Sequence, residues 1–413
     1  ESTRELTNRP SFEPLRQRLL AQYDSKERIP YATRLGPYLY NFWRDDQHVR
    51  GILRRTSFAE YRKTKPQWET VLDLDLLAKA ENENWVWHGY DALHPNYDRC
   101  LVSLSRGGAD ANVVREFDLT TRAFVTNGFS LPEAKSNVGW RDRDTLYVGT
   151  DFGPGSLTSS GYPRVVKEWR RGTPLEQARL VGEGRESDVS VGAFVVHDRG
   201  FTYEFLRREI TFFSNEAFLR RGDQWEKIEK PDDAEVGTFA DQILLTLRSD
   251  WTVGGKSYPA GALLAAPMTS YLRGERNLSV LFAPTDRKSL AGVSGTRQRL
   301  IVNELENVRN RLYLLTPREG GWDRQPFEAP AFGTVSAWGM DPEHSEEYWL
   351  TVTDFLTPSS LYHGEIEKGA PEKLKSLPSF FRTEGLRIEQ FEAVSRDGTR
   401  VPYFQVSRQG LAS

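Results

Sequence analysis

The sequence of 413 residues contains a single cysteine, Cys100. One cysteine excludes an intramolecular disulfide, a Cys-x-x-Cys redox pair and a cysteine-based zinc site together. The residue opens the apolar run Cys100-Leu101-Val102, which is typical of a buried strand. We therefore expect its thiol to fill space in the core and not to act as a nucleophile.

Long apolar runs and an excess of one charge are also missing. Leu263-Leu264-Ala265-Ala266 is typical of the longest runs, whereas a membrane-spanning helix needs roughly 18 to 20 residues. The 55 Lys and Arg nearly balance the 58 Asp and Glu, which leaves a net charge of −3. Such a chain has no overall positive field to hold phosphates. We expect a soluble protein with neither nucleic acid nor a membrane as its partner.

Aromatic residues, in contrast, are abundant: 11 Trp, 16 Tyr and 22 Phe. Because each buries a large area, the chain is expected to fold. It begins at Glu1 and not at Met, and it shows no charged segment followed by an apolar core. We therefore expect it to be a trimmed part of a longer protein. A single cysteine fits the cytoplasm, and the periplasm remains an alternative.

The N-terminal segment predicts one amphipathic helix that follows Ser11 as N-cap and ends before Pro30. Its apolar residues recur at helical spacing, at Phe12, Leu15, Leu19 and Tyr23. A stripe this narrow needs a surface to lie against, and the simplest expectation is the body of its own domain.

After Pro30 the pattern changes to short aromatic and β-branched runs, each closed by Gly, Pro, Asp or Asn. Seven of these runs are strongly apolar: 38–43, 100–104, 146–149, 201–205, 243–247, 300–304 and 348–352. They recur about every 52 residues, close to the roughly 40 to 50 of four-stranded propeller repeats. We interpret them as the inner strands of a seven-bladed β-propeller. The alternative, two β-sandwiches, needs a linker near the middle, where 231–233 is only a turn.

Beyond Pro378 the repeat pattern ends. Two strands, 386–394 and 401–406, flank the turn 396–399 and predict a hairpin that belongs to no eighth blade. We expect this hairpin to open a further domain.

No motif for catalysis is complete in the sequence. The nucleophile elbow of an α/β-hydrolase needs Gly-x-Ser-x-Gly, and the segments around Ser130 and Ser294 both lack the second glycine. The six histidines include no pair at metal-ligand spacing. The glycine loop 153–156 lacks the lysine and the following helix of a phosphate cradle. We therefore expect no metal and no cofactor.

Three groups of acidic neighbours offer a glycosidase pair as an alternative: Asp45-Asp46, Asp73-Leu74-Asp75 and Asp142-Arg143-Asp144. Such a pair must face across a cleft, whereas most propeller aspartates close turns, which is the role we expect. The arginine pairs 170–171, 207–208 and 220–221 are interleaved with acids, and we expect them in solvated loops.

Several segments resemble the prolyl oligopeptidase family of serine peptidases. Near the start these are YLYNFWRD (38–45), followed by Arg50-Gly51, and QWETVLDLD (67–75). The segment TDFGPGSLT (150–158), with YPR (162–164), is similar to a bacterial branch of the family. Towards the end, DFLTP (354–358) and SRDGTRVP (395–402) match the family's approach to its catalytic domain.

The resemblance implies a seven-bladed propeller inserted between a short helical segment and an α/β-hydrolase domain that carries Ser, Asp and His. On this basis we expect a helical segment at 1–29, an otherwise all-β propeller at 30–380 and the start of the hydrolase domain at 381–413. The catalytic triad would follow Ser413, so no catalytic residue can be assigned in this chain. The predicted helix and hairpin would normally pack against that absent domain, and we expect them to be frayed or re-packed without it.

The resemblance implies a gating propeller, and it implies that the parent enzyme is a peptidase that cleaves short peptides after proline. Its partners would be those peptides and the hydrolase domain. Candidates for the channel lining are Asn41, Ser103, Thr246, Asn303 and Thr351, although some could alternate into the blade cores. The alternatives are a stand-alone propeller that binds peptides or proteins without catalysis, and a propeller glycosidase.

Overall fold

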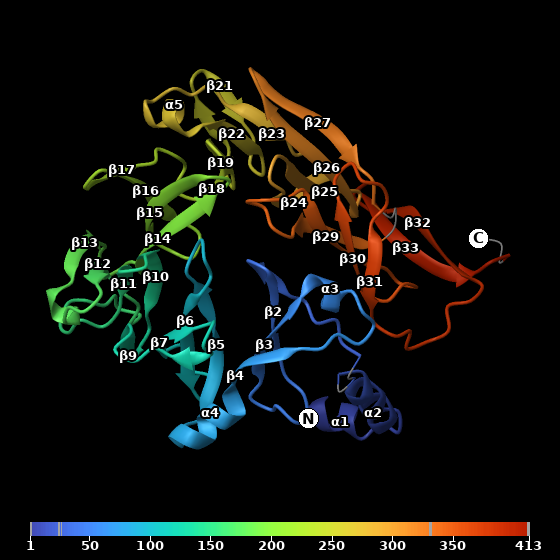
Figure 1. Cartoon of the computed structure of the whole chain (residues 1–413). Helices are drawn as coiled ribbons and strands as arrows, with labels where there is room; N and C mark the ends of the chain where they lie inside the picture. The colour runs from blue at the N-terminus through green and yellow to red at the C-terminus, as the bar shows by residue number, and fades with distance from the viewer. Residues whose placement is uncertain (1, 24, 26, 330–332, 411–413) are drawn as a thin grey trace.

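The computed structural model describes residues 2–23, 25, 27–329 and 333–410. Seven antiparallel sheets stand around a common axis like the blades of a propeller (Figure 1). Each sheet pairs four strands in the order of the sequence, and β9 (Ser130–Ala134) is added to the second sheet. The prediction of an all-β, seven-bladed propeller is confirmed.

We number the sheets blade 1 to blade 7 along the chain. Blade 1 contains β1 (Thr33–Leu35), β2 (Tyr38–Trp43), β3 (Ile52–Ser57) and β4 (Glu69–Asp73). Blade 2 contains β5 (Trp85–Ala92), β6 (Arg99–Arg106), β7 (Asn112–Asp118) and β8 (Ala123–Phe124). Blade 3 contains β10 (Asn137–Asp142), β11 (Thr145–Gly149), β12 (Val165–Arg170) and β13 (Arg179–Glu183). Blade 4 contains β14 (Ser190–Asp198), β15 (Phe201–Glu209), β16 (Asn215–Arg221) and β17 (Gln224–Lys227).

The remaining strands complete the ring. Blade 5 contains β18 (Glu235–Phe239), β19 (Gln242–Thr246), β22 (Leu263–Pro267) and β23 (Ser279–Phe282), with a small hairpin of β20 (Trp251–Val253) and β21 (Lys256–Tyr258) inserted. Blade 6 contains β24 (Lys288–Gly295), β25 (Leu300–Glu306), β26 (Arg309–Arg318) and β27 (Gly321–Phe327). Blade 7 contains β28 (Thr334–Gly339), β29 (Glu347–Thr353), β30 (Ser360–Glu365) and β31 (Glu372–Ser376).

The seven apolar runs of the sequence are the second strands of the blades, not the innermost ones. In each blade the first strand lies toward the axis and the fourth at the rim, as β14 and β17 show in Figure 1. The expectation of inner strands is therefore wrong. A second strand is paired on both edges and packed by neighbouring blades on both faces, as in the wholly buried β11, whereas the first strand β10 is partly exposed. Burial on all sides, and not nearness to the axis, makes these strands the most apolar.

The hydrophobic core lies between the blades. Tyr40 and Leu53 of blade 1 pack in one cluster with Cys100 and Leu104 of blade 2. Similar clusters join blades 4 and 5, and blades 6 and 7. Near the axis the blades approach so closely that a side chain on Gly339 of β28 would collide with the backbone of Gly295 on β24. Cys100 is fully buried, which confirms its predicted role as core filler.

The ring is closed between blades 7 and 1 by side chains. Within the described residues, no sheet combines strands from both ends of the propeller. Instead, Tyr61 of blade 1 packs in one cluster with Trp349 and Leu361 of blade 7. The Arg34 guanidinium also pairs with the Glu347 carboxylate at 3.0 Å.

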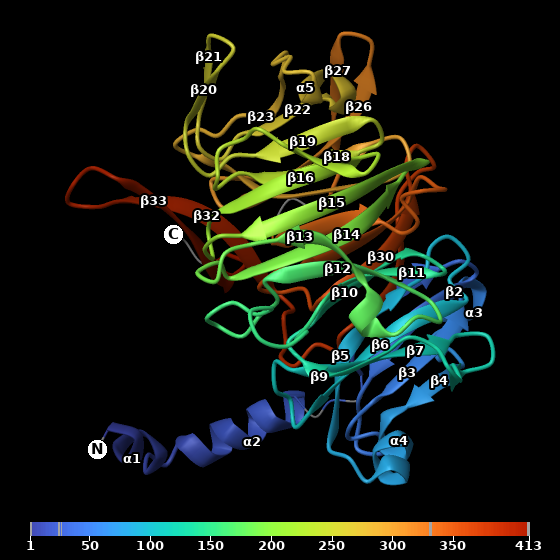
Figure 2. The same ribbon diagram turned by 90° about the vertical axis from the view of Figure 1, so that its left-hand side faces the viewer.

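Two helices precede the propeller, α1 (Ser2–Thr7) and α2 (Phe12–Tyr23). The helix predicted after Ser11 is confirmed as α2, and α1 was not predicted. None of the described residues of either helix is buried, and both project from the body (Figure 2). The simple expectation that the helix packs on its own domain is therefore wrong. The other helices are short: α3 (Phe58–Tyr61), α4 (Leu74–Glu81), α5 (Met268–Leu272) and the 3-10 turn Leu175–Gln177.

The predicted C-terminal hairpin is present as β32 (Leu386–Val394) and β33 (Arg400–Arg408). It contacts turns that join second to third strands: Gln390 donates to the Asn307 carbonyl at 2.7 Å, and Phe404 packs against Phe355. We call this side of the ring the hairpin face; the helices project on the same side (Figure 2). The turns that join first to second strands form the opposite face.

Candidate functional site: the central channel

Two cavities lie at the centre of the ring. The first, of about 490 Å³, is lined by the first strands of blades 4 to 7, with residues that include Thr238, Ser294 and Trp338. The second, of about 630 Å³, is lined by the first strands of blades 2 to 4 and includes Asp91 and Arg141. Because first strands from most of the ring contribute to them, both cavities belong to the central channel. His197 lines both cavities and stands between them.

A cluster of three side chains crosses the channel toward the opposite face. His94 follows β5 of blade 2, His197 lies near the end of β14 of blade 4, and Glu343 lies between β28 and β29 of blade 7. The two imidazole rings stack with their centroids 3.8 Å apart and their planes 14° from parallel. His94 Nε2 lies 2.9 Å from Glu343 Oε2. These blades are not neighbours in the ring, so their side chains can meet only near the axis.

Arg199 makes a second crossing on the same side. It lies in the turn between β14 and β15 of blade 4, and its Nε donates to the Thr296 carbonyl beyond β24 of blade 6 at 2.8 Å. The guanidinium also pairs with Asp198 and lies over the Phe239 ring of blade 5 at 4.1 Å. The opposite end of the channel is thus crossed by contacts among blades 2, 4 and 7 and by a contact from blade 4 to the backbone of blade 6.

A third cavity, of about 420 Å³, opens between blades 2 and 3. Its wall is polar and includes Asp110, Lys135 and Tyr162, whose hydroxyl donates to an Asp110 carboxylate oxygen at 3.1 Å. Lys135 Nζ lies 4.3 Å from the centroid of the Tyr162 ring. This cavity offers hydrogen-bond donors, acceptors and both signs of charge.

The five residues proposed from the sequence for the channel lining all lie on second strands. Thr246 lines the first channel cavity, and Ser103 lines the cavity between blades 2 and 3. Asn41 is 7% exposed, and its amide donates to the Tyr31 carbonyl at 2.8 Å. The Asn303 amide donates to the Val335 carbonyl at 2.8 Å, and the Thr351 hydroxyl donates to the Ser336 carbonyl. The structure therefore does not bring the five side chains together in one site.

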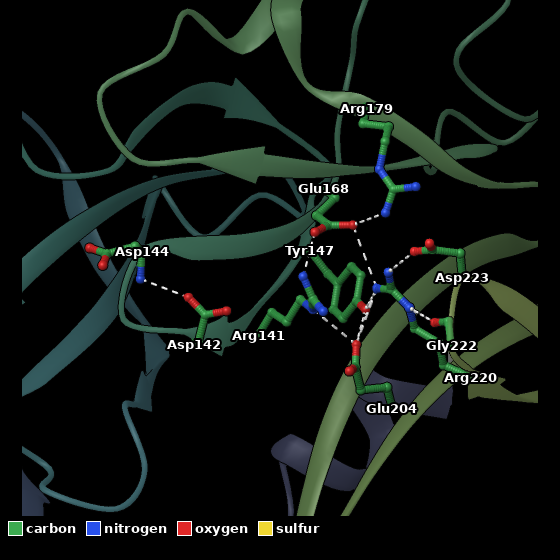
Figure 3. Close-up of polar contacts among 10 residues, drawn as sticks. All are labelled: Arg141, Asp142, Asp144, Tyr147, Glu168, Arg179, Glu204, Arg220, Gly222 and Asp223. Carbon is green, nitrogen blue, oxygen red and sulfur yellow. Dashed lines mark hydrogen bonds and ion pairs between the residues drawn. The ribbon is translucent and has the colours of Figure 1, made fainter.

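Charged side chains join blades 3 and 4 in the cluster of Figure 3. The Arg220 guanidinium, 7% exposed, donates to the Tyr147 hydroxyl at 2.5 Å and pairs with Glu204 at 3.2 Å. Arg141 pairs with Glu168 and Glu204 at 2.5 and 3.1 Å. Burial, followed by the hydrogen bond to Glu204, raises the pKa of Tyr147 above its ordinary range. The hydroxyl therefore stays protonated and donates to the Glu204 carboxylate.

The arginine pairs of the sequence serve this kind of packing. Arg208 and Arg220 lie on strands and are largely buried among carboxylates, so the expectation of solvated loops is wrong for them. The sequence pattern of charges alternating with apolar residues does not distinguish a solvated loop from an ion pair between blades.

Two of the three acidic groups close turns as predicted, whereas Asp73 caps a helix instead. Asp45 accepts hydrogen bonds from the backbone N–H groups of Gln47 and His48. Asp73 caps α4, and Asp142 accepts from the N–H of Asp144. Within residues 2–410, apart from the gaps given above, no group of three or more His, Cys, Asp or Glu is arranged to hold a metal ion. In the same part of the chain, no helix is long and apolar enough to cross a membrane.

The sequence analysis did not predict the cluster of His94, His197 and Glu343 at the opposite face. His94 and His197 are far apart in the sequence, and neither belongs to a motif. Their one shared signal is position: each lies at or just beyond the end of a first strand, where the strand leaves the channel. A correct assignment of the first strands would have placed both residues at the same end of the ring.

Comparison with known proteins identifies the family. The profile of the prolyl oligopeptidase N-terminal β-propeller domain matches residues 6–377. Uncharacterized peptidase y4nA of Sinorhizobium fredii is 39% identical over 381 residues, which cover 90% of this chain and 52% of that protein. Uncharacterized peptidase RP174 of Rickettsia prowazekii is 29% identical over 412 residues, which cover 94% of this chain and 56% of that protein.

Solved structures agree with this result. A post-proline cleaving enzyme from Rickettsia typhi superposes with a TM-score of 0.87 at 27% identity, over 99% of this chain and 62% of that one. Oligopeptidase B from Leishmania major shares the fold, with a TM-score of 0.70 at 13% identity over 98% of this chain and 57% of that one. The chain thus spans about half the length of the curated relatives it matches. It belongs to the family of prolyl oligopeptidase N-terminal β-propeller domains.

Proposed function

We propose that this chain is the gating propeller of a serine endopeptidase that hydrolyses short, proline-containing peptides. The observation that carries the proposal is the family match over 6–377 in a chain that spans about half of its peptidase relatives. The post-proline cleavage named for the Rickettsia typhi enzyme supports the choice of substrate. A cytoplasmic location is part of the proposal, since a single buried cysteine gives the fold no disulfide to form in an oxidising compartment.

The propeller would select substrates by size. Cavities of about 490 and 630 Å³ accommodate a few residues of an extended peptide but not a folded domain. Side chains cross the channel at the opposite face, so a peptide would occupy the part that opens to the hairpin face. There the walls would exclude water and orient the peptide. Thr246 and Ser103, which line cavities, are our candidates for peptide contact.

The rest of the peptidase would dock on the hairpin face. This face carries β32 and β33, and α2 projects beside it with Leu15 and Tyr23 exposed. The turn between β15 and β16 adds Phe212 and Phe213, which are 88% and 74% exposed. An apolar surface of this kind in contact with water is typical of an interface. By itself the chain would be inactive, because its sequence contains no Gly-x-Ser-x-Gly.

The test compares two proteins and two substrates. The protein made from the natural gene and the 413-residue chain are each given a proline-containing peptide of about ten residues, and a folded protein with the same bond in an exposed loop. We expect the product of the natural gene to cleave the peptide but not the folded protein. We expect the 413-residue chain to cleave neither substrate. Cleavage of both substrates at similar rates would exclude size selection. A natural product that binds the peptide without cleaving it would instead indicate a binding propeller.

A further inference from the structure

We propose that His94, His197 and Glu343 form a proton-operated closure of the channel at its opposite face. While the closure is shut, a peptide can reach the channel from the hairpin face but not from this end. The consequence for peptides rests on the proposed function; the closure itself rests on the geometry of the three residues.

The position of the cluster makes it a closure. Blade 3 separates His94 of blade 2 from His197 of blade 4, and blade 1 separates His94 from Glu343 of blade 7. Contacts of 3.8 Å between ring centroids and 2.9 Å between Nε2 and Oε2 therefore span the channel. The three side chains are also only partly exposed, as expected for groups that plug an opening. Cavities lie on both sides of His197, so its ring divides open space and not packed core.

The cluster has room for one positive charge but not for two. A proton on His94 Nε2 is shared with the Glu343 carboxylate, which balances the charge. Among the described residues, no carboxylate contacts His197: its Nδ1 lies 3.1 Å from the Thr202 hydroxyl, and its ring faces His94. A second proton on His197 would place two cations face to face. The stack should then separate, and the crossing from blade 2 to blade 4 should open.

The surroundings of His197 favour its neutral form at neutral pH. Burial, and then the charge of His94, hold the pKa of His197 below its ordinary value, and Glu343 acts in the other direction. Other titratable or charged groups also face the cluster. Tyr97 and Asp341 lie beside His94 and Glu343. The second cavity adds Asp91, Arg141, Asp142 and Arg143, and the first adds Asp198, Arg199 and Glu235. The closure should therefore open at a pH below 6.5, the ordinary pKa of histidine.

Arg199 limits how far the channel opens. Its hydrogen bond to the Thr296 carbonyl includes none of the three residues of the closure, so it should persist when His197 takes a proton. Protonation should therefore open the side of the channel next to blades 2 and 3, while the side next to blades 5 and 6 stays crossed.

The experiment measures the width of the channel directly in the 413-residue chain. Spin labels are attached to cysteines at Asn96→Cys, in the turn after His94, and at Phe201→Cys, which begins β15 four residues after His197 and is 43% exposed. The buried Cys100 should take no label. The distance between the labels is measured by pulsed electron resonance at about pH 8 and about pH 5. We expect one narrow distance at the higher pH and a longer, broader one at the lower pH.

Two variants separate the closure from general acid damage. His197→Phe keeps a flat ring that cannot take a proton, so its distance should stay short at both pH values. Glu343→Gln removes the carboxylate that favours a proton on His197, so the opening should move to lower pH. A second pair of labels, at Thr120→Cys and Gln224→Cys on the outer parts of blades 2 and 4, should keep its distance at both pH values.

The proposal is overturned if the distance from 96 to 201 is the same at both pH values, or if His197→Phe opens as the unchanged protein does. It is also overturned if the outer pair separates in parallel, because the whole ring would then be expanding. None of these measurements needs peptidase activity, so a failure here is distinct from a failure of the proposed function.

Discussion

The rings of Phe58 and His363 pack with their centroids 4.6 Å apart across the junction between the first and last blades. Phe58 begins α3 of blade 1, and His363 lies on β30 of blade 7. Trp349 lies beside both rings, 5.7 Å from His363 and 6.1 Å from Phe58. Since no described strand bridges the two blades, this aromatic group contributes much of the free energy that keeps the ring closed.

Replacing Trp349 by Ala should therefore weaken the ring. Trp349 is 2% exposed, and removal of a buried tryptophan side chain lowers the free energy of unfolding by about 3 to 5 kcal/mol. Urea unfolding followed by circular dichroism measures the change. Tyr23→Ala is the control, because Tyr23 is 80% exposed on α2 and should change the free energy of unfolding by less than about 0.5 kcal/mol. Equal effects of the two variants would contradict this account of ring closure.

His363 should make the stability of the junction depend on pH. Burial lowers its pKa below the ordinary value of 6.5, against the opposing effect of Glu347. At a pH below 6.5 the unfolded chain binds a proton that the folded chain does not, so stability falls as pH falls toward the folded pKa. His363→Phe keeps an aromatic ring beside Phe58 but removes this proton. Urea unfolding at about pH 7.5 and about pH 5 should show that the free energy of unfolding falls further at the lower pH in the unchanged protein than in the variant. If the difference in this free energy between the two proteins is the same at both pH values, the prediction is refuted.

Arg220→Ala should destabilise the packing of blade 3 on blade 4. The substitution removes a positive charge that balances the Glu204 and Glu168 carboxylates in the cluster of Figure 3. Removing one partner of a buried ion pair lowers the free energy of unfolding by roughly 3 to 5 kcal/mol. Arg318→Ala removes a pair with Asp323 in which both side chains are more than 60% exposed, and it should cost less than about 1 kcal/mol. Thermal unfolding of the two variants in parallel checks the prediction, which fails if Arg318→Ala is the more harmful.

Cysteine substitutions should separate the residues that line cavities from those that do not. Thr246→Cys and Ser103→Cys should react with a small thiol reagent in the folded chain, since both positions line cavities. Asn41→Cys should react far more slowly, because Asn41 is 7% exposed. The native Cys100 is fully buried, and burial raises its pKa above the ordinary range, so the background should be low. Reaction rates in the opposite order would remove Thr246 and Ser103 from the proposed peptide path.

Hydrogen exchange should be fast in the N-terminal helices. None of the described residues of α1 or α2 is buried, so little tertiary packing opposes their opening. Mass spectrometry of exchanged peptides should show low protection at 2–23 and high protection in β11, which is wholly buried. Strong protection of α2 in a monomer would show that the helix has found a packing surface that the structure does not contain.

Much of the fold could be predicted from the sequence because the blades repeat. Apolar strands at a regular interval gave the number of blades, and the apolar alternation beyond Pro378 gave β32 and β33. The turn-closing roles of Asp45 and Asp142 were also predictable, since an aspartate in a turn commonly accepts hydrogen bonds from the backbone N–H groups that follow it. These features depend on local patterns, which a single sequence contains.

Contacts across the ring could not be predicted in the same way. His94 and Glu343 meet only because the ring closes, and nothing near either residue in the sequence indicates the other. The channel lining was misplaced for a related reason: burial selects apolar residues on second strands, so the strongest pattern points away from the axis. Arg220 likewise has the sequence context of a surface residue, and only the packing of two blades buries it.

The most direct test of the central claim is the natural coding DNA that follows the codon for Ser413. We predict that it continues in frame for about another domain and encodes Gly-x-Ser-x-Gly, followed by the Asp and His of a catalytic triad. That result would identify the propeller as the gating part of a serine peptidase. A stop codon directly after Ser413 would contradict the account and leave a propeller that binds its partners without catalysis.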